Sequence, residues 1–194
     1  MLNKVKVLLV EDDQDFVFLI QKMIKRDGKL DYLGHASGRA SGVEMAQSLK
    51  PDIVVMDLNL SGSELDGIEA AKNIRLTTDA KVLLLTSYEQ PEIIINASKK
   101  AFASGYVFKS QSQILTDIIY KTATSHTPQE EFIKELLLGE LTPAERGVVS
   151  NMLEGNEDTL SSSSLKTVAN QKTSIFKKLG VKKTSELIRI FRSW

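Results

Sequence analysis

Short apolar runs alternate with amphipathic stretches over the first 124 residues of the chain. Apolar runs of about four to eight residues are typical of buried strands, whereas apolar positions spaced three and four residues apart indicate helices that pack by one face. The pattern predicts strands at residues 4–10, 30–35, 53–57, 81–86 and 105–108. It predicts helices at residues 14–27, 39–49, 66–76, 91–102 and 112–124.

This regular alternation predicts a doubly wound α/β fold. Each connection between strands is long enough to hold a helix, and such crossovers are right-handed, so the five repeats give a five-stranded parallel sheet with helices on both faces. Residues 30–35 form the least apolar of the predicted strands, as expected at an edge of the sheet.

The pattern changes after residue 124. Residues 124–128 indicate a break, and Gln129–Leu138 predicts a short linker helix. Thr142, Pro143 and Glu145 then have the spacing of a capping box, which starts a helix that ends near Gly155. Further helices are predicted at residues 164–179 and 185–190. We therefore expect three parts: residues 1–124, a linker at 125–140, and a small all-α domain at 141–194.

The net charge is zero, but it is unevenly distributed. Residues 161–194 hold eight basic residues against one acidic residue, a net charge of +7, so residues 1–160 carry −7. A basic C-terminal domain suggests a polyanionic partner. The absence of cysteine excludes disulfides and thiol-ligated metals. No apolar stretch approaches the roughly 20 residues that cross a bilayer, and Met1 leads directly into a strand, so we expect a soluble cytoplasmic protein.

Charged and polar side chains gather where the predicted strands end. Glu11 and Asp12 follow the first strand, Asp57 ends the third, Thr86 ends the fourth, and Lys109 follows the fifth. Functional groups in open parallel sheets collect outside the carboxyl ends of the strands, so these side chains can converge on one pocket. Crowded carboxylates repel each other, and a hard divalent cation relieves that repulsion.

The N-terminal part resembles the receiver domain of bacterial two-component response regulators, which has a flavodoxin-like fold. The resemblance covers about residues 4–124. The stretches that carry it are Val10-Glu11-Asp12-Asp13, Met56-Asp57-Leu58-Asn59, Leu85-Thr86-Ser87 and Ser104-Gly105-Tyr106-Val107-Phe108-Lys109.

This resemblance implies that a sensor histidine kinase transfers a phosphoryl group to Asp57. It also implies a Mg²⁺ site in which Asp12 binds directly, Glu11 binds mainly through water, and Asp57 and the backbone carbonyl of Asn59 complete the protein ligands. Such a chain is a phosphoacceptor that phosphorylates and dephosphorylates itself, rather than a turnover enzyme.

Charge that builds on the phosphoryl oxygens during transfer needs stabilisation, for which Lys109 and Thr86 are the candidate catalytic groups. Thr86 and Tyr106 are the candidate switch residues, although Tyr106 could simply pack on a helix. Asp13 is interpreted as a helix N-terminal residue rather than a metal ligand. The isolated His35 and His126 are interpreted as structural.

Two departures from the receiver pattern stand near these residues. The loop after Asp57 is two residues longer than usual and lacks the usual proline, and Ser110 replaces a common proline after Lys109. We expect these changes to affect the tuning of the site more than its chemistry.

The C-terminal domain resembles the LuxR-type helix-turn-helix of NarL/FixJ-class regulators. The matching residues are Leu141-Thr142-Pro143-x-Glu145, Thr167-Val168 and Ile175-Phe176-Lys177-Lys178-Leu179-Gly180-Val181. The resemblance implies binding to double-stranded promoter DNA through a recognition helix, and we expect a homodimer because helix-turn-helix proteins commonly read paired half-sites. The side chains expected at the bases are those of Lys166, Thr167, Asn170, Gln171 and Lys172. Lys177 and Lys178 are expected at phosphates.

Only eleven residues, Asn156–Lys166, separate Gly155 from Thr167, which is about one helical turn fewer than the family usually has. Four of them are consecutive serines, which compete with helical hydrogen bonds, so the support helix is expected to be short or absent. Two alternatives to this function stay open. The output domain could act by protein interaction or dimerisation, or the chain could be an atypical regulator that works without phosphate.

Overall fold

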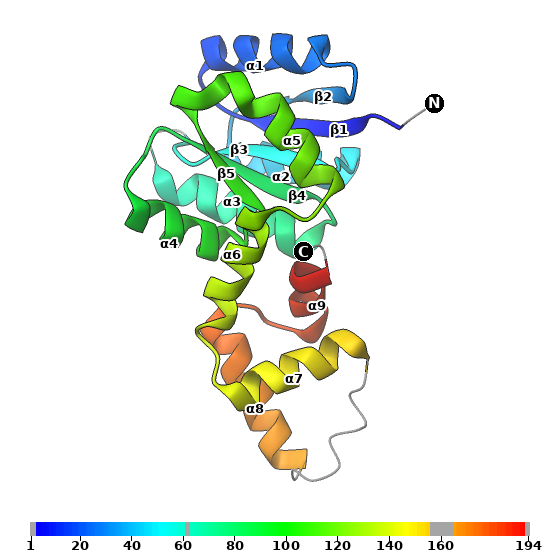
Figure 1. Ribbon diagram of the computed structural model, residues 1–194, viewed down its shortest axis with the longest axis vertical. Coiled ribbons are helices and arrows are strands. Elements are labelled where there is room, and N and C mark those ends of the chain that lie inside the picture. The colour runs from blue at the N-terminus through cyan, green and yellow to red at the C-terminus, as the bar shows by residue number, and fades with distance from the viewer. Residues whose placement is uncertain (1–2, 61–62, 156–164, 193–194) are drawn as a thin grey trace. The chain divides into compact units, whose positions relative to one another are not determined.

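The computed structural model describes residues 3–60, 63–155 and 165–192 (Figure 1). The chain divides into two compact units, Met1–Ile133 and Lys134–Trp194. The division falls within the predicted linker. In the part of the chain that the structure describes, no helix has the length and apolar character needed to cross a membrane.

The first unit contains the predicted parallel sheet. Its strands are β1 (Val5–Val10), β2 (Leu30–Ala36), β3 (Ile53–Asp57), β4 (Lys81–Thr86) and β5 (Gly105–Phe108). They lie in the order β2-β1-β3-β4-β5, and every neighbouring pair is parallel. The predicted fold class and the edge position of the second strand are therefore confirmed.

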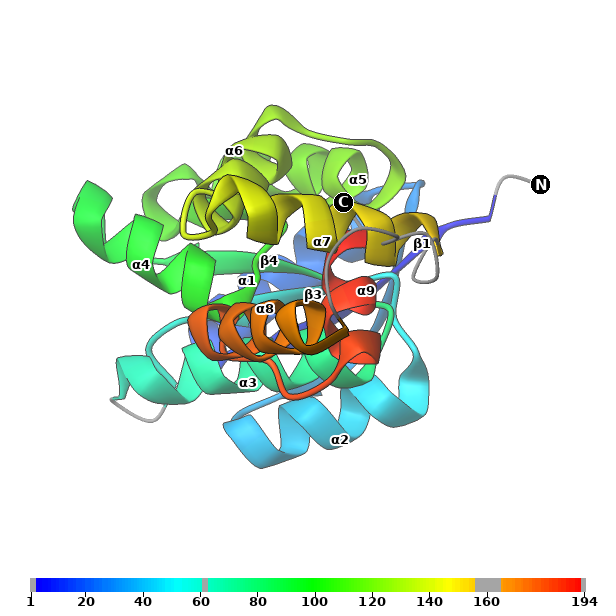
Figure 2. The same cartoon turned by 90° about the horizontal axis from the view of Figure 1, so that it is seen from below.

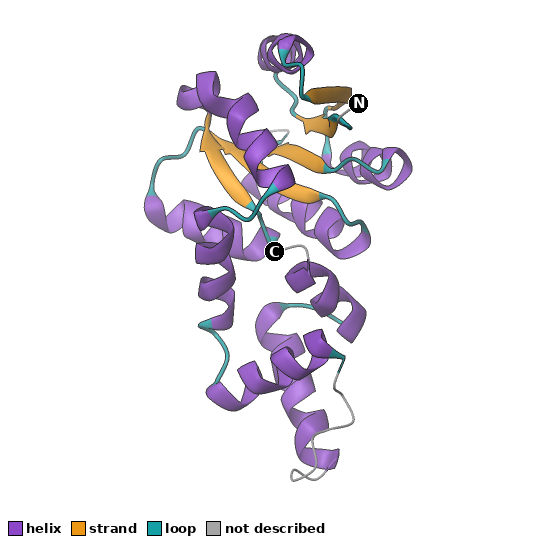
Figure 3. Cartoon of the chain, turned by 45° about the vertical axis from the view of Figure 1, so that its right-hand side comes forward, coloured by secondary structure: helices purple, strands orange, loops and turns teal. Residues whose placement is uncertain are grey.

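Helices cover both faces of this sheet (Figure 3). The helices of the unit are α1 (Gln14–Arg26), α2 (Arg39–Leu49), α3 (Glu64–Thr77), α4 (Pro91–Ala101), the 3-10 helix η1 (Lys109–Ile114), α5 (Leu115–Thr124) and the start of α6 (Pro128–Leu138). Helices α1 and α5 lie on one face of the sheet, and α2, α3 and α4 lie on the other (Figure 1). The predicted helix at 112–124 begins instead as a 3-10 turn from Lys109.

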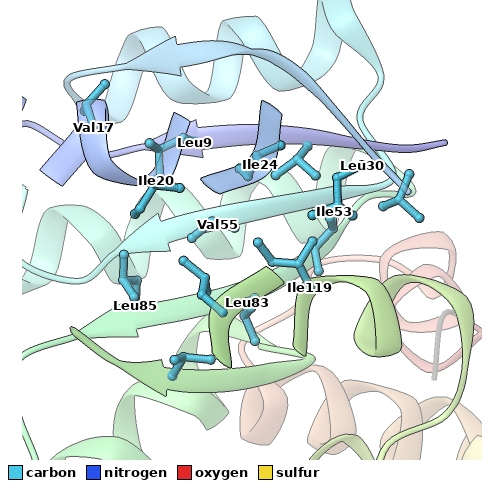
Figure 4. Packing of buried hydrophobic residues seen from close by; sticks show 14 residues of the cluster. Leu9, Val17, Ile20, Ile24, Leu30, Ile53, Val55, Leu83, Leu85 and Ile119 are labelled. Atoms are coloured by element: carbon cyan, nitrogen blue, oxygen red, sulfur yellow. The ribbon is translucent and has the colours of Figure 1, made fainter. Parts of the chain in front are cut away.

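The central strands are apolar on both faces because both faces are covered. Val7 and Leu9 of β1 pack with α1 and α5, while the alternate residues Leu8 and Val10 are equally buried on the opposite face. Figure 4 shows Ile20 and Ile24 of α1 and Ile119 of α5 meeting the side chains of the sheet. Such strands admit few polar side chains, so most of these occur near the strand ends.

Local signals explain where α1 begins. Asp13 is its N-cap, and the Asp13 Oδ1 atom accepts the backbone N–H groups of Asp15 at 2.9 Å and Phe16 at 3.2 Å. The interpretation of Asp13 as a helix-capping residue is therefore confirmed.

The first turn of α6 is fixed to the sheet of the first unit. Thr127 and Glu130 form a capping box, since Thr127 N donates to Glu130 Oε2 and Glu130 N donates to Thr127 Oγ1, both at 3.2 Å. The buried Glu130 carboxylate also pairs with the Lys81 ammonium at 2.8 Å. Gln129 Oε1 accepts the backbone N–H of Tyr106 on β5 at 3.1 Å.

A fully buried arginine lies in the same region. Arg75 Nε donates to the carbonyl oxygen of Phe102 at 2.8 Å, and Arg75 Nη1 donates to that of Ala80 at 3.3 Å. Burial lowers the pKa of Arg75 to about 10, and the nearby charge of Glu130 partly offsets this effect. The predicted break at 124–128 is therefore short, and the linker helix begins as a packed element of the first unit.

The second unit is helical, as predicted, and contains α7 (Pro143–Glu154), α8 (Leu165–Leu179) and α9 (Thr184–Arg192). Helix α7 packs against both α8 and α9 (Figure 2). Its capping box between Thr142 and Glu145 is present, and Gly155 ends it with a positive φ of 75°. The predicted short support helix falls within residues 156–164, which lie outside the described residues.

Glu145, which belongs to the capping box of α7, also binds two side chains of α8. Its carboxylate accepts the Ser174 hydroxyl and the Lys178 ammonium of α8, each at 2.6 Å. These two hydrogen bonds, with help from the Thr142 backbone N–H, lower the pKa of Glu145 to about 2. A buried carboxylate thus joins the start of α7 to α8.

The Lys81–Glu130 pair gives a stability prediction. Changing Glu130→Gln keeps the capping box, because glutamine also serves at that position, but leaves the Lys81 ammonium without its carboxylate. We expect the first unit to lose about 2–3 kcal/mol of unfolding free energy, within the range for a hydrogen bond to a charged group. Urea unfolding of the full chain, followed by tyrosine near-UV circular dichroism, measures this unit selectively because all four tyrosines belong to it.

The matched control is Asp117→Asn, which removes the exposed Lys121–Asp117 pair of α5, where the side chains are 63% and 60% exposed. We expect a loss below about 0.5 kcal/mol. Equal effects of the two substitutions would show that the burial of Glu130 does not stabilise the unit.

Candidate functional site at the carboxyl edge of the sheet

The structure brings three of the predicted carboxylates together. Glu11 and Asp12 follow β1, and Asp57 is the last residue of the neighbouring strand β3. One carboxylate oxygen from each lies within 4.8 Å of the others. Glu11 and Asp57 are buried, whereas Asp12 is accessible from solvent.

Lys109 reaches this cluster from the end of β5. Its ammonium lies 2.7 Å from Glu11 Oε2 and 3.1 Å from Asp57 Oδ2. Burial disfavours the charged form of Lys109, but its hydrogen bond with Glu11 and the charges of Asp57 and Glu11 outweigh this effect and raise the pKa of Lys109. The lysine therefore stays protonated and bridges the two buried carboxylates.

One ammonium does not balance the cluster. Burial, reinforced by the neighbouring charge of Asp57, raises the pKa of Glu11 to about 7, although hydrogen bonds from Lys109 and from the backbone N–H of Asp13 act against the shift. A carboxyl group with such a pKa holds a proton over a wide pH range when no further cation is near. The site is thus short of positive charge.

A magnesium ion suits this donor set. Glu11, Asp12 and Asp57 offer hard carboxylate oxygens, and Mg²⁺ prefers oxygen ligands, of which it usually takes only one or two carboxylates and fills the rest with water or phosphate. Asn59 lies beside them, since its backbone N–H donates to Asp57 Oδ1 at 3.2 Å. Its predicted role as a carbonyl ligand stays a prediction.

Gly67 keeps the backbone beyond Asp57 in place. A Cβ atom added at Gly67 would collide with the carbonyl oxygens of Asp57 and Leu58, so the first turns of α3 can pass this close to the strand end only with glycine. Residues 61–62 of the longer loop lie outside the described residues.

The two candidate switch residues lie on adjacent strands. Thr86, at the end of β4, is buried, and its hydroxyl oxygen accepts the backbone N–H of Tyr88 at 3.0 Å. Tyr106 on β5 is half-buried, and its ring lies 5.7 Å from that of Phe108. Because the Tyr106 N–H is bound by Gln129, the strand of the candidate switch also holds the first turn of α6.

Two contacts near the site and the anchoring of α6 elsewhere in the first unit were not predicted from the sequence. The Lys109 ammonium lies over the ring of Phe16, 4.8 Å from its centroid. Ser110 Oγ donates to Glu89 Oε1 at 3.0 Å, which joins the loops after β4 and β5. The anchoring of α6 had a signal, since Thr127-Pro128-Gln129-Glu130 repeats the Thr-Pro-x-Glu pattern of Thr142–Glu145. His35 and His126 are exposed and lie outside the acidic cluster.

The predicted DNA-contacting residues all belong to α8. Thr167, Asn170 and Lys177 are exposed, and Gln171 and Lys172 are half-buried. The side chain of Lys166 lies outside the described side chains. The Lys178 ammonium is bound to the Glu145 carboxylate at 2.6 Å, so this lysine has a partner within its own unit.

The raised pKa of Glu11 gives a pH prediction. The folded protein binds a proton at Glu11 more tightly than the unfolded chain does, so this contribution to stability is complete below pH 4.5 and is lost as the pH rises through about 7. Without metal, the unfolding free energy of the first unit should therefore fall by roughly 1–3 kcal/mol across this range.

The change Glu11→Gln should flatten this pH dependence, and Mg²⁺ should restore stability to the parent protein above pH 7. Tyrosine near-UV circular dichroism during urea unfolding measures both effects. An equal pH slope in the parent and in Glu11→Gln would exclude Glu11 as its source.

Comparison with known proteins agrees with this geometry. The family model for the response regulator receiver domain matches residues 7–120. A nitrate/nitrite response regulator homologue of Haemophilus influenzae is 28% identical over 80% of this chain and 78% of its own length. The transcriptional regulatory protein YdfI of Bacillus subtilis is 26% identical over 95% of this chain and 94% of its own length.

A solved structure described as a complex of the two-component response regulator RcsB with DNA covers 98% of this chain and 99% of its own, with a TM-score of 0.54 and 22% identity. At that identity the likeness is one of fold. The family match spans more than half of the chain and includes every residue of the acidic cluster. The chain therefore belongs to the response regulator receiver domain family.

Proposed function

We propose that Asp57 accepts a phosphoryl group from a sensor histidine kinase in a Mg²⁺-dependent reaction in the cytoplasm, and that this reaction controls the C-terminal unit. The observation that carries the proposal is the buried Asp57 carboxylate, 3.1 Å from the Lys109 ammonium and next to two further carboxylates. A lone buried aspartate would be protonated or capped, whereas this one is paired with a cation and borders an oxygen-rich site.

The chemistry follows from these groups. An Asp57 carboxylate oxygen forms a bond to phosphorus as the P–N bond of the donor phosphohistidine breaks, and the electron pair leaves with the imidazole nitrogen. Bound Mg²⁺, held by Asp12, Asp57 and the Asn59 carbonyl, with Glu11 acting through water, would neutralise charge on the carboxylates and phosphoryl oxygens. Lys109 stabilises the charge that grows on a phosphoryl oxygen, and the Thr86 hydroxyl donates to another.

The burial of Asp57 supports a switch. A phosphoryl group adds charge and hydrogen-bond acceptors where a small carboxylate was, so the Thr86 hydroxyl gains a charged oxygen to which it can donate, while its own oxygen accepts the Tyr88 N–H in this structure. Movement of Thr86 frees space for Tyr106, whose backbone is bound to α6. The protein would thus act as a phosphoacceptor and not as a turnover enzyme.

We propose promoter DNA as the target of the C-terminal unit, bound by a homodimer through α8. The excess of basic residues after residue 161 and the exposed polar residues of α8 support an interface with a polyanion. In helix-turn-helix proteins, two-fold dimers read paired half-sites. Lys178 is omitted from the proposed contacts because Glu145 binds its ammonium.

Asp57→Asn should abolish acyl-phosphate formation, because an amide is not a nucleophile for this transfer. Incubation with acetyl phosphate and Mg²⁺, followed by intact-protein mass spectrometry, measures the added phosphoryl group. Asp13→Asn is the matched control, since Asp13 caps α1 and should leave the modification intact. Modification of Asp57→Asn at the rate of the parent would refute the assignment.

For DNA, Gln171→Ala should weaken binding to a specific promoter fragment about 5- to 100-fold, while binding to unrelated DNA changes little. Lys177→Ala should weaken binding to the specific fragment and to unrelated DNA alike, and should reduce the slope of log affinity against log salt by about 1. Titrations by fluorescence anisotropy at several salt concentrations distinguish the effect on specific binding from the effect on binding to any DNA. The change Lys22→Ala in α1 is the control. Indifference of the phosphorylated protein to both substitutions would favour an output domain that acts by protein interaction.

A further inference from the structure

Lys109 has a third neighbour besides its two carboxylate partners. Its ammonium lies over the ring of Phe16, 4.8 Å from the centroid, within the range in which a cation is attracted to the negative face of an aromatic ring. Glu11 and Asp57 approach the same ammonium at 2.7 and 3.1 Å. The side chain is only 18% exposed, so these groups enclose most of it.

The position of Phe16 is fixed by the site itself. Phe16 lies in the first turn of α1, where its backbone N–H donates to the capping carboxylate of Asp13 at 3.2 Å. The backbone N–H of Asp13 donates in turn to Glu11 Oε1 at 3.2 Å. The half-buried ring also packs against the core between α1 and the sheet. A closed circuit of contacts thus runs from Glu11 through Asp13 and Phe16 to Lys109 and back.

We propose that Phe16 is a positioning residue for Lys109, holding the ammonium over its ring so that it faces an incoming phosphoryl group. The proposal rests on the proposed function, because phosphoryl transfer is the reaction for which Lys109 would be positioned. Lysine is a flexible side chain with a compact charge, so it gains from a partner that limits its rotamers. The ring also excludes water from one side of the ammonium.

The ring differs from the carboxylates in one decisive respect. A phosphoryl group would be bonded to Asp57, and a metal ion would lie beside Asp57 and Glu11. The contacts of both carboxylates with Lys109 must therefore change during the reaction. Phe16 is uncharged and takes part in neither event. Among the contacts of Lys109 in the described residues, the ring is therefore the one that can persist throughout. Simple core packing accounts for an apolar side chain at position 16 but not for a cation above its face.

Fluorination of the ring tests this role without changing its shape. Mono-, di- and trifluorinated phenylalanine at position 16 progressively weaken the negative ring face while the volume stays nearly constant. We expect the rate of phosphorylation of the full chain by phosphoramidate with Mg²⁺ to fall stepwise, by about 3- to 10-fold for the trifluorinated ring. Equal rates across the series, with the parent fully reactive, would overturn the proposal.

The matched control is the same series at Phe18, which lies on the same helix with the Lys22 ammonium 5.9 Å from its ring centroid. Lys22 is not part of the site, so fluorination there should leave the rate unchanged. A small-molecule donor keeps the surface on which a kinase could dock out of the measurement. An equal fall in both series would also overturn the proposal, because it would show a general effect of fluorine.

A second readout does not depend on phosphorylation. In the metal-free protein, the side-chain protons of Lys109 near the ring should be shifted upfield in NMR spectra by the ring current, and Phe16→Leu should remove that shift. Phe16→Tyr, which keeps a ring face, should retain both the shift and the rate. Loss of the proposed function would appear as a parent that accepts no phosphate, whereas loss of this inference would appear as Lys109 signals that ignore Phe16→Leu.

Discussion

The confinement of two buried carboxylates beside one ammonium is the constraint on which the rest of the molecule depends. Glu11 directly follows β1 and Asp57 ends the adjacent parallel strand β3, so the backbone hydrogen bonds of the sheet hold their charges together against their repulsion. Burial, together with the charge of Asp57, raises the pKa of Glu11 to about 7 in spite of the hydrogen bond from Lys109. The folding energy of the core thus maintains two buried carboxylates and an ammonium in close contact at one edge of the sheet.

The chain layout follows from the same constraint. Strands covered on both faces admit almost no polar side chain, so the chemistry is confined to the loops at one edge of the sheet. Gly67 allows α3 to pass directly beside the end of β3, and Asp13 starts α1 immediately after the acidic pair. Packing and site geometry are therefore set by the same few residues.

Most of the fold and the positions of the acidic cluster could be predicted from the sequence because both follow from local patterns. The apolar runs of β3 and β4 fix their bounds, and the residue that ends each run must lie at the carboxyl edge. Contacts of single side chains across large sequence separations could not be predicted this way. The Thr-Pro-x-Glu pattern indicates a helix start at Thr127, but it does not show that Glu130 turns inward to Lys81. Similarly, the sequence shows a basic residue at position 178 but not that its ammonium pairs with the Glu145 carboxylate of α7.

The contact between Gln129 and Tyr106 has a consequence for the solution behaviour of the protein. Strand β5 is an edge of the sheet, and an open edge with unpaired backbone groups can add a strand from another molecule and so begin aggregation. Gln129 occupies the N–H of Tyr106, and a Cβ added at Gly105 would lie 2.8 Å from the same Gln129 oxygen, so this part of the edge is closely covered. The start of the linker helix therefore leaves this backbone N–H of the edge strand unavailable to a strand of another molecule.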